Sequence, residues 1–104
     1  MNENYYTSIF SAPASLLDGQ NQLSGKLELW ETIITFRLAD FQNSHLNLTI
    51  PIVSIEKVEE FLIFNLAKNG LRIQNTNGRF DLFVLEESDV LKKMILGKIK
   101  KMES

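Results

Sequence analysis

The stretch SGKLELWETIITFRL, residues 24–38, alternates apolar and polar side chains and then changes the phase of that alternation. Its apolar residues occupy odd positions up to Leu29 and even positions from Ile34 onward. A period of two is typical of a strand with one buried face, and a tight turn between two strands changes which parity faces the core. The stretch therefore predicts an antiparallel hairpin with its turn at residues 31–32.

The register of this hairpin follows from matching its apolar side chains. With the turn at residues 31–32, apolar residues face one another on one side, and two cations face each other on the opposite side. The predicted pairs are Leu29 with Ile34, Leu27 with Phe36, Gly25 with Leu38 and Lys26 with Arg37. A slip of one residue would turn the apolar set toward the other face, so the sequence favours this register.

A second hairpin is centred on Asn77-Gly78, a dipeptide that favours a two-residue type I′ turn. This turn places Ile73 opposite Leu82 and leaves Phe83 on the other face of the hairpin. A longer turn would exchange the roles of Leu82 and Phe83. The sequence leaves both registers open.

The other segments complete a series of about seven strands followed by one helix. Strands are predicted over residues 7–17, 46–52 and 55–66, a polar loop over residues 18–25, and a turn over residues 67–70. Pro51 lacks the N–H that a central strand needs, so its strand is expected at a sheet edge or near a bend.

From Ser88 onward the pattern becomes helical. Apolar residues from Val90 to Met102 recur at the spacing of one helix face, and five lysines crowd the opposite face. Ser88 is predicted as the N-cap, with Asp89 in the first turn, where the helix dipole favours negative charge. We expect one domain over residues 1–104, with residues 1–6 as a flexible N-terminal arm.

Several local motifs occur in an order that resembles the GRAM and bacterial branch of the pleckstrin homology (PH) superfold. The matching motifs are Gly25-x-Leu27-x-Leu29, Ile34-x-Phe36, Ile50-Pro51 followed by Ile55 and Val58, and Gly70-Leu71-x-Ile73. The similarity covers roughly residues 8–102. Trp30 departs from the pattern, which has threonine after the L-x-L motif. The last strand also departs from it, because apolar residues occur at both even and odd positions, whereas one buried face would need them at only one.

The resemblance implies a mainly β (α+β) fold, a bent antiparallel sandwich or barrel of about seven strands capped by one C-terminal α-helix. It also implies a binding function rather than catalysis, because relatives bind phosphoinositides or proteins. The bulky apolar residues predicted to face inward would fill so small a barrel, which disfavours a role as a carrier of a small apolar ligand.

The composition and motifs argue against several other classes of function. The sequence has no cysteine, a single histidine, His45, and a formal net charge of −2, so neither a zinc site nor a nucleic-acid surface is expected. No catalytic motif is present. We therefore predict a protein that is not an enzyme and uses no cofactor, metal or small-molecule substrate. The absence of cysteine and of a basic, apolar leader favours a cytoplasmic location.

Two candidate binding sites remain. Lys26 and Arg37, opposed on the outer face of the first hairpin, form a candidate site for an anion or a lipid headgroup, although residues 18–24 before them contain no lysine or arginine. A candidate protein interface follows from apolar residues on both strand parities, because a small barrel buries only one. Its residues are Phe61, Leu62, Ile63, Phe64 and Phe83.

The predicted function is a non-catalytic PH/GRAM-like binding module that mediates protein contact or self-association as a homo-oligomer. The alternative is weak peripheral binding to anionic membrane lipids through Lys26, Arg37 and the helix lysines. For the apolar run at residues 61–66, coverage by the chain's own N-terminal arm or helix is the competing interpretation.

Overall fold

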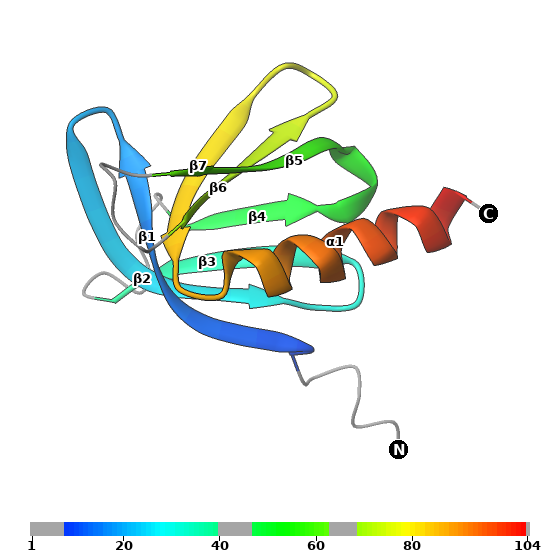
Figure 1. Cartoon of the computed structure of the whole chain (residues 1–104), viewed down its shortest axis with the longest axis horizontal. Helices are drawn as coiled ribbons and strands as arrows, with labels where there is room; N and C mark the ends of the chain where they lie inside the picture. Colours follow the sequence, from blue (N-terminus) through cyan, green and yellow to red (C-terminus); the bar gives the residue numbers. More distant parts are fainter. Residues whose placement is uncertain (1–7, 40–46, 63–68, 104) are drawn as a thin grey trace.

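The computed structural model describes residues 8–39, 47–62 and 69–103. Seven strands precede one helix, as Figure 1 shows. In chain order, with a short 3-10 helix between β4 and β5, the elements are β1 (Phe10–Asp18), β2 (Asn21–Leu29), β3 (Ile33–Leu38), β4 (Leu48–Pro51), η2 (Ile52–Ser54), β5 (Ile55–Leu62), β6 (Asn69–Asn75), β7 (Phe80–Leu85) and α1 (Ser88–Glu103). The mainly β architecture with one C-terminal helix confirms the predicted fold class.

All seven strands belong to one antiparallel sheet, in the order β4-β3-β2-β1-β7-β6-β5. The sheet is bent, so that its two ends enclose the core, and α1 packs against β5, β6 and η2 (Figure 1). Because β4 stands at one end of the order, the predicted edge position of the strand that contains Pro51 is confirmed.

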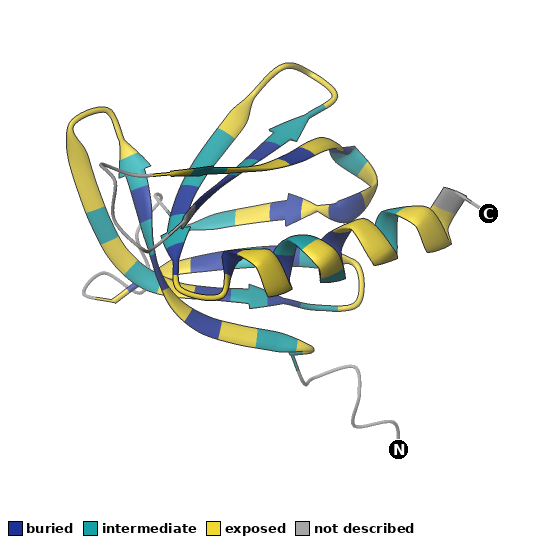
Figure 2. Cartoon of the chain, viewed as in Figure 1, coloured by how far each residue is buried: buried dark blue, intermediate teal, exposed yellow. Residues whose placement is uncertain are grey.

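The β2–β3 hairpin has the register that the alternation predicted. Leu29 faces Ile34, Leu27 faces Phe36, and the remaining predicted pairs also occur. The inward residues of both strands are buried, and Figure 2 shows the alternation of buried and less buried residues along them. The Trp30 N–H donates a hydrogen bond to the Ile33 carbonyl at 2.8 Å, which closes the turn.

The β6–β7 hairpin has the longer turn that the sequence left open, and the register based on a two-residue turn is wrong. The Asn75 N–H donates to the Arg79 carbonyl at 2.7 Å, and the Gly78 N–H donates to the Asn75 carbonyl at 3.0 Å. Three residues therefore form the loop, and Gly78 closes it with a positive φ of 91°. As a result Phe83 pairs with Leu71, one position away from the pairing that the shorter turn predicted.

One predicted loop is shorter than expected, and one residue of a predicted turn lies in a strand. β2 begins at Asn21, directly after a turn in which Gly19 has a φ of 63°, so most of the predicted polar loop is strand. Gly70 lies within β6 rather than in a turn. The first case has a simple cause: Leu23 pairs with the buried Leu16 on β1 and packs against the core, while its polar neighbours lie in the exposed part of the strand.

The helix begins at Ser88 as predicted, but Ser88 is not the N-cap. The Leu91 N–H donates to the Glu87 carbonyl at 3.0 Å, which places Ser88 inside the first turn. Its hydroxyl is fully buried and has no hydrogen-bond partner among the described residues. Leu91 and Ile95 are buried in the core, whereas Val90 and Met102, predicted on the same face, are about 40% exposed.

Close packing at Gly25 predicts a specific cost for any side chain there. A methyl group on Gly25 would overlap with the Arg37 carbonyl oxygen and lie 2.6 Å from Phe36 Cζ. We therefore expect Gly25→Ala to lower the free energy of unfolding by about 1–3 kcal/mol, measured by urea denaturation. The matched control is Gly97→Ala in α1, where nothing lies within 4 Å; this change should instead raise stability by about 1 kcal/mol. Equal effects of the two substitutions would contradict the packing argument.

Candidate functional site

The two predicted cations lie where the hairpin register places them. Lys26 on β2 pairs with Arg37 on β3, and both residues are exposed on the outer face of the sheet. The Lys26 Nζ atom lies 3.9 Å from Glu28 Oε2, so part of its charge is compensated. The neighbouring β1–β2 turn offers only Asp18, Gly19, Gln20 and Asn21. Two cations without a donor-rich loop make a weak anion site.

The candidate apolar interface is only partly at the surface. Phe83 is fully buried and is not available to a partner, because the three-residue turn directs it into the core. Leu62 is 70% exposed. Ile63 and Phe64 lie outside the described residues, as do His45 and the predicted N-terminal arm.

Phe61 is covered by the chain itself. It pairs with Gly70 on β6, and any side chain on Gly70 would overlap with the Phe61 ring. The far end of the ring therefore lies over Gly70, an arrangement in which an aromatic side chain shields a glycine in a neighbouring strand. This contact explains why Gly70 is buried on an outer strand pair.

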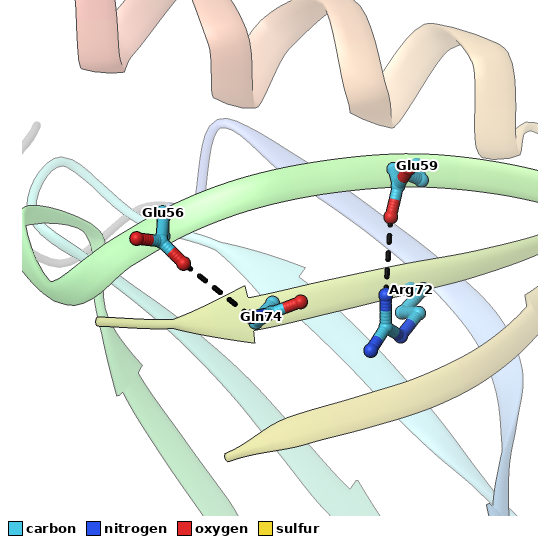
Figure 3. A network of polar contacts seen from close by, with 4 residues as sticks. All are labelled: Glu56, Glu59, Arg72 and Gln74. Carbon is cyan, nitrogen blue, oxygen red and sulfur yellow. Dashed lines mark hydrogen bonds and ion pairs between the residues drawn. The ribbon is translucent and has the colours of Figure 1, made fainter. Parts of the chain in front are cut away.

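A further polar cluster lies on the outer face of β5, β6 and β7 (Figure 3). Arg72 Nη1 donates to Glu59 Oε1 at 3.1 Å, and the guanidinium lies 4.4 Å from the centre of the Phe80 ring. Gln74 donates to Glu56 at 3.3 Å beside it. These groups satisfy one another across neighbouring strands, which is typical of sheet stabilisation rather than of a binding site.

The structure contains a pocket that the sequence did not predict. It has a volume of about 280 Å³ and lies between β4 and the β6–β7 hairpin. Its lining residues are Asn47, Leu48, Thr49, Ile50, Asn75, Arg79 and Asp81. Polar groups from two distant parts of the sequence therefore meet where the bent sheet is open.

Asp81 points toward the interior of the bent sheet. It pairs with Ile73, which is 1% exposed, and it shares its face of β7 with Phe83. Only 12% of its side chain is exposed, and Arg79 Nη2 lies 3.9 Å from its Oδ1 atom. Burial raises the pKa of the Asp81 carboxyl above its ordinary value of 3.8, and the charge of Arg79 offsets part of that rise.

Residues of β4, which has no strand partner on its second edge among the described residues, also line the pocket. The Ile52 N–H donates to the Thr32 carbonyl at 3.0 Å, in line with the β3–β4 register. Hydrogen-bonded pairs alternate along an antiparallel ladder, so the backbone N–H and C=O of Thr49 point away from β3. Pro51 has no N–H, and its carbonyl accepts a hydrogen bond from the Ser54 hydroxyl at 2.7 Å. Among the described residues of β4, Thr49 is thus the one with an unpaired edge donor and acceptor.

In the part of the chain that the structure describes, no helix combines the length and hydrophobicity of a membrane span. The same part contains no group of three or more histidine, cysteine, aspartate or glutamate residues placed to hold a metal ion.

Comparison with solved structures identifies the fold as PH-like. The C-terminal domain of an unknown protein from Leishmania infantum superposes with a TM-score of 0.75 at 11% identity, over 89% of this chain and 84% of that one. The Vps36 N-terminal PH domain gives 0.72 at 13% identity, over 92% and 80%. The Slm1-PH domain in complex with inositol 4-phosphate gives 0.56 at 16% identity, over 89% and 95%.

Neither a protein-family model nor a curated protein matches the chain. At these identities the likeness to solved structures shows the fold alone. The PH-like class predicted from the motifs is therefore supported, and the narrower GRAM assignment stays a prediction.

The contact between Phe61 and Gly70 predicts unequal roles for two neighbouring residues. Removing the ring by Phe61→Ala would uncover the glycine backbone, so we expect a loss of about 1 kcal/mol of unfolding free energy. Leu62→Ala is the control, because a side chain that is 70% exposed should change stability by less than about 0.5 kcal/mol. Thermal and urea unfolding measure both; a larger effect at Leu62 would mean that its side chain is covered in solution.

The raised pKa of Asp81 predicts a pH-dependent stability effect. The folded protein holds this proton more tightly than the unfolded chain, so wild-type stability falls as pH rises from below 3.8 through the raised pKa. Asp81→Asn removes that dependence. We expect the variant to melt above wild type at about pH 7, with the gap narrowing toward about pH 3. Glu60→Gln, which removes an exposed carboxylate from β5, controls for net charge; a pH-independent gap would rule out the role of Asp81 burial.

Proposed function

We propose that the chain is a non-catalytic PH-like binding module that takes an extended segment of a protein partner at the free edge of β4. The observation that carries this proposal is that the N–H and C=O of Thr49 point away from β3, while Thr49 itself lines the pocket. An unpaired strand edge is a template for another extended chain. The pocket leaves room beside this edge, and its other walls are polar.

The short edge also limits what can pair with it. β4 has four residues, and Pro51 supplies no donor. A partner strand would therefore gain its backbone hydrogen bonds mainly at Thr49 and would depend on side-chain contacts for the rest of its affinity. Such a site favours a selected peptide over indiscriminate pairing.

Binding to an anionic lipid is the second candidate. Its support is the exposed, directly opposed pair Lys26 and Arg37, together with a likeness to a PH domain solved with inositol 4-phosphate. The carboxylate of Glu28 beside Lys26 and the net charge of −2 weaken it. A lipid role would place the protein at the membrane periphery.

Other parts of the proposal come from the sequence. Self-association through the exposed Leu62 at the end of β5 is one form of the protein contact, since the protein partner can be a second copy of the chain. The cysteine-free sequence supports the cytoplasmic location that we propose, and the motif order supports a place in the GRAM branch.

The edge proposal has a sharp test in Thr49→Pro. The Thr49 N–H is not used in the β3–β4 ladder, so proline should leave the fold intact and remove the edge donor; circular dichroism and the melting temperature check this. Peptides selected on wild type from a phage-displayed random library should bind Thr49→Ala unchanged and Thr49→Pro at least about 10-fold more weakly.

The same preparations separate the two candidates. Vesicles containing phosphatidylserine and phosphatidylinositol 4-phosphate serve as the lipid probe, and Lys26→Glu with Arg37→Glu as the matched variant. Two results together would overturn the edge proposal in favour of the lipid. Wild type would bind these vesicles while the double variant would not, and no selected peptide would be sensitive to Thr49→Pro. Light scattering of wild type and Leu62→Glu shows whether a second copy is the partner.

A further inference from the structure

The Asp81 carboxylate is poorly compensated by its surroundings. Within the described residues no hydrogen bond reaches its oxygens, and its charged neighbour Arg79 lies 3.9 Å from Oδ1. The Arg79 side chain is 62% exposed, so much of that charge is shared with solvent. The carboxylate lines the pocket but keeps only 12% of its side-chain exposure, so its charge is partly desolvated, which is unfavourable. A ligand that brings a charged donor to Asp81 would offset this cost.

We propose, resting on the proposed function, that the pocket receives the ammonium group of a lysine side chain from the segment that pairs with β4. Side chains along an added strand alternate between the two faces of the sheet. Those on the inner face share the side of Ile50, which is buried and lines the pocket. A lysine at such a position would extend between β4 and β7, toward Asp81.

The chemistry of the lining favours lysine over arginine. Arg79 Nη2 already lies 3.9 Å from Asp81 Oδ1, so an incoming cation would share this carboxylate with a guanidinium. A single oxygen suits a compact ammonium, whereas a guanidinium forms its strongest contacts with both oxygens of a carboxylate. Asn75 Oδ1 lies 3.2 Å from the Ser54 hydroxyl and, with two lone pairs, can accept a second hydrogen bond. It supplies a second acceptor for the ammonium.

The ligand would also be compatible with the charge of Arg79. An ammonium and Arg79 are both positive, but the Arg79 side chain is 62% exposed, so solvent screens much of their repulsion and Arg79 can stay near Asp81. The carboxylate would then add a charge-assisted hydrogen bond to a long ion pair, and such hydrogen bonds are the stronger kind.

The test uses four short peptides and nuclear magnetic resonance of the ¹⁵N-labelled full chain. The probe is acetyl-Val-Lys-Val-amide, and its matched control carries acetyl-lysine, which keeps the side-chain length and removes the charge. Acetyl-Val-Arg-Val-amide tests the choice of cation. Val-Leu-Val-amide with a free amino terminus tests whether a chain end can replace the lysine. The amide signals of Thr49, Ile50 and Ile73 report on the pocket.

We expect the lysine peptide to shift these signals with a dissociation constant in the millimolar range. The acetyl-lysine, arginine and free-terminus peptides should bind at least about 10-fold more weakly, and so should the lysine peptide to Asp81→Asn. That variant is expected to be at least as stable as wild type near neutral pH, so loss of folding would not explain its loss of binding.

The outcomes distinguish the two proposals. The lysine and acetyl-lysine peptides could bind equally well, with Thr49→Pro abolishing this binding and Asp81→Asn leaving it unchanged. That result would overturn the lysine assignment and keep the β4 edge. Stronger binding of the arginine or free-terminus peptide would also overturn the lysine assignment. Lysine binding that depends on Asp81 but not on the Thr49 N–H would overturn strand pairing. Absence of any shift at about 20 mM peptide would contradict both proposals, since a site with a dissociation constant in the low millimolar range would be mostly occupied at that concentration.

Discussion

The ring of Phe36 on β3 meets the ring of Phe83 on β7 with their centres 5.6 Å apart and their planes at 51°. Both rings are essentially excluded from solvent, and they come from the two halves of the bent sheet. Tilted aromatic pairs at this separation are favourable beyond the area that they bury. Two glycines make the contact geometrically accessible. Gly25 lets β3 approach β2 closely beside Phe36, and Gly78 sets the turn that directs Phe83 inward.

The position of Phe83 fixes the orientation of its whole strand. Side chains at every second position of β7 share a face, so an inward Phe83 requires that Asp81 and Leu85 also point inward. Leu85 lies in the core, where this is favourable. Asp81 lies nearer the turn, where the core ends and the pocket begins. The inward position of Phe83 thus places the Asp81 carboxylate at a site where an apolar residue would be more stable.

The two hairpins show how far the sequence could predict the fold. The β2–β3 register was predictable because apolar and polar residues alternate strictly, so only one register matched. In β7, Leu82 and Phe83 are adjacent and both apolar, and the choice between them depends on one turn residue. Gly78 at positive φ adds that residue to the turn, and sequence patterning gave no reason to prefer it. The same uncertainty made Phe83 a wrong surface candidate and hid Asp81 as a pocket residue, whereas Lys26 and Arg37 were placed correctly.

The pocket itself could not be predicted, because it depends on which strands do not pair. β4 and β5 stand at opposite ends of the sheet order, so the edge of β4 stays open toward the β6–β7 hairpin. The sequence suggested an edge through Pro51 but not what would face it. Among the described residues of β4, Thr49 has an unpaired backbone donor and acceptor, and it lines the same pocket as the inward carboxylate of Asp81. In strand-addition sites, backbone hydrogen bonds supply affinity and side-chain pockets supply specificity. In the strand addition that we propose, β4 offers few edge bonds, so selectivity would come chiefly from the charge on β7, and the turn at Gly78 would be as important to recognition as the edge itself.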